Sequence, residues 1–306
     1  MRWMLNRLFT ACAACLSACD STAPNPPGGG EHPLVPGRIA FSMNVEGNID
    51  IYSVADGGTG LERITTGPAI DRDPSWSPDG LRLAFVSGGV DERRIHLIDK
   101  DGTDAVRLTD GNAGGTTGDD TSPAWSRDGT RIAFVHESRI YTVATDGSDV
   151  QLFDPPLPVP PSFTCRSQRS PSWATDGSIV YAEDLCSGIP GVYRAPLDGG
   201  SAVLLAELNP GPSPRLITSP AISSRDQLVY VYALPDNPVF AQFLNVGGAG
   251  GLVPDEPAWG PDGSALVFIG RETQSGPGRL HVLGANGTGR RELGLDADVA
   301  SPDWTR

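Results

Sequence analysis

The sequence is nearly without lysine and holds few cysteines and histidines. Lys100 is the single lysine among 23 basic residues, which stand against 37 acidic residues and leave a net charge of −14. A chain with this balance offers no basic patch to a phosphate backbone, so we expect no nucleic-acid partner. The apolar stretch near the N-terminus, residues 8–18, is far shorter than the roughly 20 residues that span a bilayer as a helix.

The common signatures of hydrolases, zinc enzymes and nucleotide-binding proteins are also missing. There is no G-x-S-x-G, H-E-x-x-H, P-loop or G-x-G-x-x-G. His96 and His281 replace tyrosines in a repeated strand pattern, His32 lies in a proline-rich segment, and His136 ends a strand alone. We therefore predict no histidine cluster, no metal and no cofactor, and we favour a protein that is not an enzyme.

Glycine and proline are abundant instead: 38 Gly and 28 Pro make 66 of 306 residues. Long helices are therefore not expected. The hydrophobic fraction of 39% and the charged fraction of 20% are near globular averages, which excludes a mostly disordered chain. A chain of this length is one large domain or two ordinary ones.

The N-terminus has the features of an export signal. Arg2 and Arg7 precede the short apolar stretch, which ends in Leu-Ser-Ala-Cys at residues 16–19. This ending resembles the lipobox of bacterial lipoproteins, and the resemblance implies cleavage before Cys19 and lipidation of its sulfur. An ordinary cleavage site with an incidental cysteine is the alternative. We assign residues 1–18 to a signal peptide and place the protein in the bacterial cell envelope, anchored to a membrane by lipid, in the periplasm or outside the cell.

Residues 19–36 read as a lipidated cysteine and a flexible tether. Five Pro and three Gly lie between Asp20 and Pro36, a composition that cannot bury enough apolar surface to order itself. Cys165 and Cys186 are the cysteines left in the mature domain, and a hairpin turning at residues 176–177 brings them within two residues of direct opposition. We predict a disulfide between them in an oxidising compartment.

Residues 37–306 repeat one unit. The motif at residues 73–80, DPSWSPDG, returns at 122–129, 170–177, 219–226, 256–263 and 301–304. Its anchor positions are spaced 37 to 49 residues apart, within or near the period of a four-stranded propeller blade: Trp76, Trp125, Trp173, Ile222, Trp259 and Trp304. After each anchor come an Asp-Gly-type turn, a β-forming apolar run such as residues 82–86, a third strand such as 94–98, a second turn and a fourth strand. The copy from 222 to 259 is short and has the least certain register.

The two ends of the repeat complement one another. The chain opens with an orphan second strand at residues 38–41 and ends with an orphan first strand around Trp304. We predict an all-β fold: a six-bladed β-propeller of four-stranded antiparallel blades, its ring closed by pairing the C-terminal strand with the N-terminal blade. An open stack of sheets is the alternative.

The repeat resembles that of the TolB-like β-propeller family, whose pattern is SPxWSPDGxxIAF…IY…DxDG. The resemblance covers about residues 36–306, and residues 73–109 and 122–152 are two of its best copies. It implies a propeller of WD-like repeats. Propellers serve binding, scaffolding and catalysis alike, so the resemblance is much less specific for function.

The predicted repeat brings a set of mostly charged residues to one mouth of the central channel. Loops on this face differ in length from blade to blade, whereas the Asp-Gly turns of the opposite face are nearly identical; variable loops on a rigid scaffold are where binding usually resides. The predicted rim consists of Asp71, Arg72, Asp73, Asp119, Asp120, Gln168, Arg169, Asp255, Glu256, Asp296 and Asp298. It could bind a cation, a basic peptide or a polar ligand such as a sugar; alternatively it is a solvated face whose charges pair among themselves.

The leading hypothesis is a monomeric, non-enzymatic envelope lipoprotein that presents these loops to a protein or polysaccharide. One alternative is a carbohydrate lyase or hydrolase that uses rim carboxylates. Another is an accessory or sensor subunit of an envelope transport system. The run DKDGTD at residues 99–104 suggests a calcium loop, but the same Asp-Gly recurs in every blade, so we predict a tight turn there.

Overall fold

The computed structural model describes residues 37–158, 166–185, 191–207, 216–233, 252–273, 275–295 and 297–305. The chain divides into two units, Met1–Pro33 and Leu34–Arg306, and every described residue belongs to the second. Its described elements are 22 strands and one short 3-10 turn, Ala113–Gly115. Within this part of the chain no helix has the length and apolar character needed to cross a membrane.

The apolar runs after the Asp-Gly turns form strands that are buried along most of their length. In β5 (Arg82–Ser87), β9 (Arg131–His136) and β19 (Ala265–Arg271), at least four consecutive residues are buried. A strand covered on one face alternates between buried and exposed residues, so continuous burial means that each of these strands is covered on both faces. The repeated sheets therefore pack face to face.

Five sheets have four antiparallel strands each, as predicted. We number the sheets 1 to 6 in the order of their innermost strands along the chain. Sheet 1 comprises β4 (Asp71–Trp76), β5, β6 (Arg94–Asp99) and β7 (Val106–Arg107); sheet 2 comprises β8 (Asp120–Trp125), β9, β10 (Arg139–Ala144) and β11 (Gln151–Phe153). Sheet 3 comprises β12 (Arg166–Trp173), β13 (Ile179–Leu185), β14 (Gly191–Ala195) and β15 (Val203–Glu207); sheet 5 comprises β18 (Val253–Trp259), β19, β20 (Arg279–Gly284) and β21 (Arg291–Glu292).

Sheet 6 joins the two ends of the repeat. Its order is β22 (Asp298–Trp304), β1 (Arg38–Val45), β2 (Asn48–Ala55) and β3 (Glu62–Arg63). β22 and β1 are antiparallel, with Ile39 opposite Trp304 and Ala40 opposite Asp303. The last described strand of the chain thus pairs with the first.

Sheet 4 departs from the prediction of six four-stranded blades. It has two described strands, β16 (Leu216–Ile222) and β17 (Leu228–Ala233), so the structure shows five four-stranded blades instead of six. The remainder of this repeat falls at residues 234–250, which lie outside the described residues. It is also the repeat in which Ile222 replaces the anchor tryptophan.

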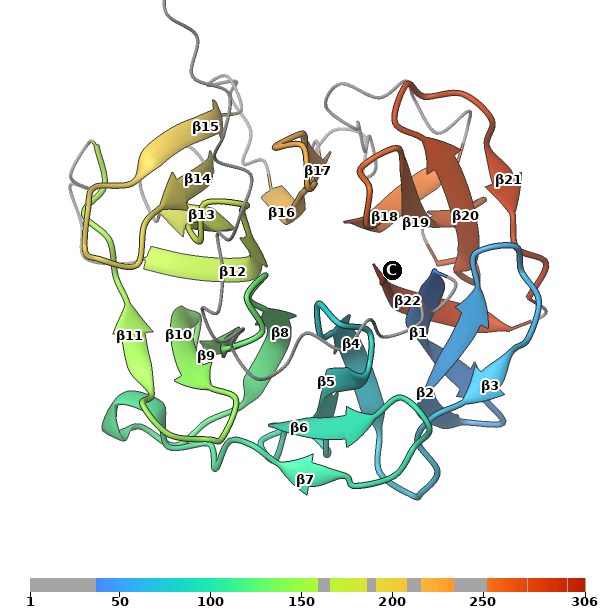
Figure 1. Cartoon of the computed structure of the whole chain (residues 1–306), viewed down its shortest axis with the longest axis horizontal. Coiled ribbons are helices and arrows are strands. Elements are labelled where there is room, and N and C mark those ends of the chain that lie inside the picture. Colours follow the sequence, from blue (N-terminus) through green and yellow to red (C-terminus); the bar gives the residue numbers. More distant parts are fainter. Residues whose placement is uncertain are drawn as a thin grey trace, which may run out of the picture. The chain divides into compact units, whose positions relative to one another are not determined.

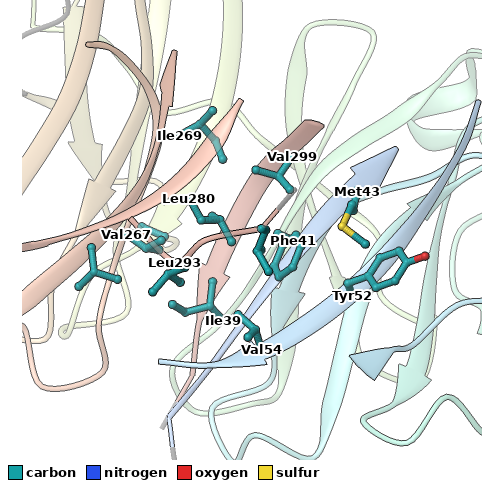
Figure 2. Close-up of a cluster of buried hydrophobic side chains, with 13 residues drawn as sticks. Ile39, Phe41, Met43, Tyr52, Val54, Val267, Ile269, Leu280, Leu293 and Val299 are labelled. Carbon is teal, nitrogen blue, oxygen red and sulfur yellow. The ribbon is translucent and has the colours of Figure 1, made fainter. Parts of the chain in front are cut away.

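In the described unit the innermost strands β4, β8, β12, β16, β18 and β22 lie nearest the middle (Figure 1). Each contacts the next along the chain, and β22 contacts β4. Six buried apolar clusters each join two neighbouring sheets. Figure 2 shows the cluster between sheets 5 and 6, where Ile39, Phe41 and Val54 pack with Val267 and Leu280.

Candidate functional site

Each innermost strand carries an irregularity at the residue before the proline of the repeated motif, where the motif reads Ser-Pro, Asp-Pro or Glu-Pro. In β4, β8, β12, β16, β18 and β22 the pairing register shifts at this point, because two residues of the innermost strand lie opposite one residue of its partner. All six residues have a left-handed backbone, with φ between 46° and 52°. We call these six residues the pre-proline ring: Asp73, Ser122, Ser170, Ser219, Glu256 and Ser301.

This backbone is uncommon for residues other than glycine and costs roughly 1 kcal/mol or more at each position. It occurs at β-bulges, which turn a side chain away from the direction that regular pairing would give it. A serine directly before a proline is typical of a turn. The structure instead places the four serines of this ring inside strands, at bulges: Ser122, Ser170, Ser219 and Ser301.

The pre-proline ring lines a cavity of about 570 Å³ to which all six innermost strands contribute. The ring is chemically divided. Glu256, Ser301 and Asp73 belong to the consecutive sheets 5, 6 and 1, whereas sheets 2, 3 and 4 contribute only serines to it. One side of the cavity is therefore acidic and the other carries hydroxyl groups.

On the acidic side, Ser301 links two carboxylates. Its hydroxyl donates to Asp73 Oδ1 at 2.7 Å and lies 3.5 Å from Glu256 Oε1, and its backbone N–H donates to Glu256 Oε2 at 2.6 Å. Burial, followed by repulsion from Asp255, raises the pKa of Glu256 to about 7. At neutral pH this site thus holds an acid that is partly protonated beside a second carboxyl group.

Further along the cavity wall lie Asp303 and Arg127. Burial raises the pKa of Asp303 to about 6, although Oδ2 accepts a hydrogen bond of 2.6 Å from the backbone N–H of Trp76. The Arg127 guanidinium donates to the carbonyl oxygens of Trp173 and Ile222, at 3.1 and 2.9 Å. Arg127 thus connects sheet 2 with sheets 3 and 4 across the channel.

Most of the other residues of the predicted rim bind neighbouring backbone or side chains. Asp119 Oδ1, Gln168 Oε1 and Asp298 Oδ1 each accept a backbone N–H from within one residue of the start of the third strand in an adjacent sheet. The donors are Arg93, Ile140 and Gly278 respectively, at 2.7 to 3.0 Å. These residues fasten one sheet to the next. For them the structure favours the alternative in which the charges of the loop face are satisfied internally.

Among the remaining rim residues, some form ion pairs and others are buried with a polar atom that has no hydrogen-bond partner. Arg169 pairs with Asp184, and Asp255 lies 3.7 Å from Arg271 while accepting the backbone N–H of Glu256. Asp71 is buried, one of its oxygens has no hydrogen-bond partner, and burial raises its pKa. The Nε of Arg72 is also buried without a partner. Asp73 and Glu256 are the described residues of the predicted rim that line the central cavity.

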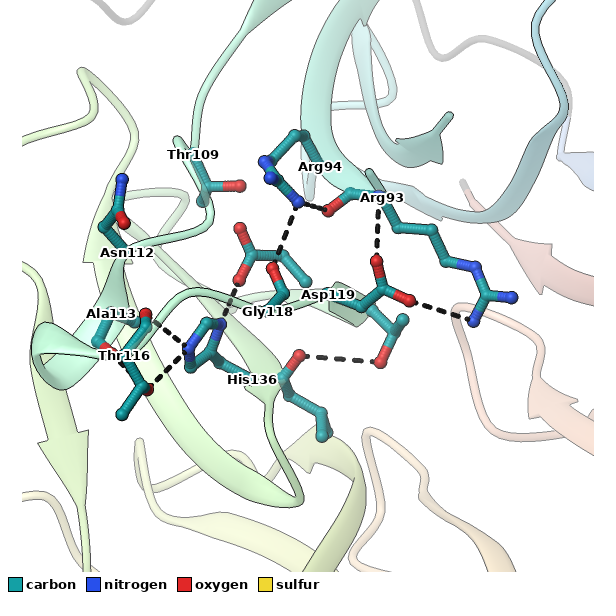
Figure 3. A network of polar contacts seen from close by, with 12 residues as sticks. Arg93, Arg94, Thr109, Asn112, Ala113, Thr116, Gly118, Asp119 and His136 are labelled. Carbon is teal, nitrogen blue, oxygen red and sulfur yellow. Dashed lines mark hydrogen bonds and ion pairs between the residues drawn. The ribbon is translucent and has the colours of Figure 1, made fainter. Parts of the chain in front are cut away.

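Asp120 and His136 form a buried pair that the sequence analysis missed. Their carboxylate and imidazole are 2.8 Å apart, and each side chain is 1% exposed. Figure 3 shows the ring of His136 in hydrogen-bonding contact with Thr116. His136 was expected to end a strand alone. The hairpin register places it opposite Asp120. Counting back from Trp125 and forward from Ile132 gives Glu137 instead, because the bulge between Thr121 and Ala124 shifts the pairing by one residue.

The opposite face consists of turns, as predicted. Asp101 Oδ1 accepts the backbone N–H and the hydroxyl of Thr103, and Asp146 Oδ1 does the same with Ser148. These hydrogen bonds lower the pKa of both aspartates. The turn explanation of residues 99–104 is confirmed. The part of the chain that the structure describes contains no group of three or more His, Cys, Asp or Glu side chains arranged to hold a metal ion.

Four predicted positions lie outside the described residues: Cys19, Cys165, Cys186 and Asp296. His96 and His281 lie in the third strands β6 and β20, against Phe85 and Phe268, with ring centroids 5.6 and 5.3 Å apart. Burial lowers the pKa of both histidines.

No protein-family profile matches the chain. Over 63 residues, 21% of its length, it is 38% identical to a protein TolB homolog of Chlorobium luteolum, and over 69 residues it is 39% identical to the Tol-Pal system protein TolB of Desulfosudis oleivorans. The matches span 14% and 16% of those proteins. The crystal structure of TolB from Acinetobacter baumannii superposes on 88% of this chain and 66% of its own, with a TM-score of 0.63 and 17% identity. The chain has a TolB-like β-propeller fold.

Proposed function

We propose that this protein is a cell-envelope binding module whose ligand enters the central cavity at the pre-proline ring. The observation that carries the proposal is the pairing of Asp73 and Glu256 through Ser301 on the wall of that cavity. Most other predicted rim residues have partners within the chain, whereas these two border a space large enough for a side chain or a short segment of a partner.

The chemistry of the site favours a basic protein segment. A carboxylate pair in a confined cavity attracts a guanidinium or ammonium group, and the serines of the opposite side supply donors and acceptors for a peptide backbone. The negative net charge of the chain adds to this attraction at a distance and makes it sensitive to salt. TolB-like proteins include a named component of the Tol-Pal system, which supports a role in assembling envelope proteins.

The test uses fluorescent peptides of equal length that carry basic, neutral or acidic residues, with anisotropy measured at 20 and 300 mM NaCl. The basic peptide should bind most tightly and should lose affinity in salt. The double variant D73N/E256Q should weaken binding at least tenfold, whereas D101N/D146N on the turn face should leave it unchanged. Equal binding of the three peptides, or loss only in the turn-face variant, would contradict the proposal.

The Asp73–Glu256 pair also supports a second candidate, acid–base catalysis on a carbohydrate. An acid with a pKa of about 7 beside another carboxyl group is the arrangement by which glycoside bonds are cleaved. A screen of neutral and acidic oligosaccharides for new chain ends tests this candidate, and E256Q should abolish any activity found. Peptide binding without turnover would favour the first candidate.

The remaining proposals concern architecture and location. We propose that the six sheets form one closed propeller, supported by the β22–β1 pairing and the six apolar clusters. We further propose that residues 1–18 are a signal peptide, that residues 19–36 tether the propeller to a membrane through lipid on Cys19, and that Cys165 and Cys186 form a disulfide. The mass of the mature N-terminus tests the lipid, and thiol titration of the unreduced, unfolded protein tests the disulfide.

A further inference from the structure

The loop between β7 and β8, residues 108–119, presents a threonine to a buried histidine. The hydroxyl of Thr116 lies 3.0 Å from His136 Nε2 (Figure 3), and Nδ1 of the same ring lies 2.8 Å from Asp120 Oδ1. Thr116 is exposed, whereas the side chains of His136 and Asp120 are each 1% exposed. A hydroxyl next to an imidazole, whose other nitrogen binds a carboxylate, is the arrangement that makes a hydroxyl nucleophilic in acyl-transfer enzymes.

The hydrogen bonds of this group fit a neutral imidazole beside an ionised carboxylate. When Nδ1 carries the proton and donates to Asp120, Nε2 keeps a lone pair that accepts the hydroxyl proton of Thr116. The hydroxyl has a second acceptor in the carbonyl oxygen of Ala113, but at 3.2 Å this atom is farther away than Nε2. The His136 ring is thus placed to act as a general base toward Thr116.

The surroundings of His136 favour the ring after it has taken the hydroxyl proton. The carbonyl oxygen of Thr116 lies 3.1 Å from Nε2, so it faces a lone pair of the neutral ring but accepts a hydrogen bond from the protonated ring. Asp120 stabilises the positive charge of the protonated ring through Nδ1. Both groups therefore interact better with the imidazolium than with the neutral imidazole, and interactions gained on the way to the transition state are those that raise a rate.

The loop is fixed near β6 on both sides of Thr116. Thr109 Oγ1 accepts the backbone N–H of Ile95 at 3.0 Å, and Asp119 Oδ1 accepts the backbone N–H of Arg93 at 3.0 Å. These attachments hold the two ends of the loop on a paired strand, so the hydroxyl keeps its distance to the ring without support from a ligand.

Tyr141 on β10 packs against both the loop and the ring. Gly114 has a φ of 64°, and a Cβ at this position would lie 2.3 Å from the Tyr141 hydroxyl oxygen. Glycine therefore lets the loop approach β10 closely. The Tyr141 ring also contacts His136 edge-on, with centroids 5.8 Å apart, and this contact supports the orientation of the imidazole. The hydroxyl, the imidazole and the carboxylate are thus held in place before any substrate binds.

A donor for the negative charge that develops during acyl transfer adjoins the hydroxyl. The backbone N–H of Thr117 directly follows Thr116 and makes no hydrogen bond to another residue that the structure describes. In enzymes with a nucleophile elbow, the N–H of the residue after the nucleophile is one of the donors to the oxyanion. The Thr117 N–H can serve the same purpose here.

We propose that Thr116, His136 and Asp120 form a nucleophilic triad that transfers the acyl group of a small ester to the Thr116 hydroxyl and then to water. The Thr116 oxygen bonds to the carbonyl carbon while its proton passes to His136 Nε2. The bond to the leaving alcohol then breaks, and the alcohol takes that proton. Attack by water, with the same two proton transfers, releases the acid and restores Thr116.

The substrate is small because the nucleophilic oxygen shares its carbon with a methyl group and the ring behind it is buried. The inference does not depend on the proposed function, since Thr116 and His136 are not among the residues that line the central cavity.

A fluorophosphonate ester tests the nucleophile, because it forms a stable bond with activated hydroxyl groups and releases fluoride. Incubated with the full chain and followed by peptide mass spectrometry, it should modify Thr116 at least tenfold faster than Thr59, an exposed threonine between β2 and β3. T116S should react at least as fast as the wild type, since serine keeps the hydroxyl and lacks the methyl group. The control T59V should behave like the wild type. Absence of an adduct on Thr116 would overturn the proposal.

Hydrolysis of p-nitrophenyl acetate by the full chain tests turnover and the role of Asp120. T116V should lower the rate at least a hundredfold, and T116S should retain it. Asp120 acts through His136 and does not touch the ester, so D120N should lower the maximal rate at least tenfold while the ester concentration at half-maximal rate stays unchanged. A wild-type rate in T116V or in D120N would overturn the proposal. Because Thr116 is exposed, T116V keeps the test decisive even if an H136A variant fails to fold.

Discussion

The carboxyl group of Glu256 shows how strongly one residue of this protein depends on its surroundings. It is held by two hydrogen-bonding groups of Ser301 and repelled by Asp255 and Asp73. Its pKa is about 7 in the folded protein, against an ordinary value of 4.5. The folded state therefore binds a proton more tightly than the unfolded state, and folding is favoured by acid at this position.

We expect the free energy of unfolding to fall as pH rises from about 4.5 to 7, because the contribution of protonated Glu256 is complete below 4.5 and lost above 7. The loss should be on the order of 2 kcal/mol. In E256Q this part of the pH dependence should disappear. Urea unfolding of both proteins at pH 5 and pH 8 measures it, and the raised pKa of Asp303 cancels because it is common to both. Identical pH dependence in the two proteins would contradict the assignment.

At the scale of strands, two kinds of hydrogen bond join the innermost strands of neighbouring sheets. In the first kind, the side chain two residues after a pre-proline residue accepts the backbone N–H of the anchor residue in the next sheet. Asp303 accepts from Trp76, and Ser75 accepts from Trp125. In the second kind, the residue two positions after the pre-proline residue is alanine, and the indole N–H of the anchor tryptophan in the next sheet donates to the carbonyl oxygen of that alanine. Trp173 donates to Ala124 at 3.0 Å, and Trp259 donates to Ala221 at 3.2 Å.

These two kinds of attachment predict different costs for the same substitution. W173F removes an indole that bonds Ala124, whereas W76F removes a buried indole N–H that has no partner. Both tryptophans are buried, so the loss of packing is similar. W173F should destabilise the protein by about 0.5–1.5 kcal/mol more than W76F, because it removes a hydrogen bond to the carbonyl oxygen of Ala124. Denaturant midpoints measure the difference, and equal destabilisation would show that the indole bond contributes nothing.

At the scale of the whole unit, sheet 6 is built from strands at opposite ends of the described chain. β22 pairs with β1 and contacts β4 and β18, and its Asp303 and Ser301 bind residues of sheet 1. Removing this strand exposes one edge of β1 and breaks the hydrogen bonds by which Ser301 links Glu256 of sheet 5 with Asp73 of sheet 1. The cost is shared by three sheets.

We therefore expect deletion of residues 298–306 to lower the denaturant midpoint sharply or to abolish cooperative unfolding, since several kcal/mol is a large part of a stability of about 5–15 kcal/mol. A synthetic peptide of the deleted residues, added in excess, should restore the midpoint. Circular dichroism during guanidinium unfolding provides the measurement. A deletion protein that unfolds like the full chain would mean that β22 does not fasten the unit.

Much of this architecture follows from the sequence alone because its determinants are local. The Asp-Gly turns and the apolar runs are each set within about ten residues, and the anchor positions recur every 37 to 49 residues. Together they place β5 and β6 within one residue of their observed bounds. The repeat also predicts the pairing of the last strand with the first. The short copy after Ile222 gave the weakest prediction, and sheet 4 has two described strands there.

The candidate site required the tertiary structure, because its contacts join residues that no local pattern relates. Ser301 meets Glu256 across 45 residues and Asp73 across 228. A repeat places all rim residues at one mouth, but whether each carboxylate lines the cavity depends on a bulge and on the donors of the neighbouring sheet. Asp119 and Asp298 accept backbone N–H groups next to β6 and β20, whereas Asp73 and Glu256 meet at Ser301 on the cavity wall. Local chemistry thus determined the blades, and the packing of sheet against sheet decided which charges line the central cavity.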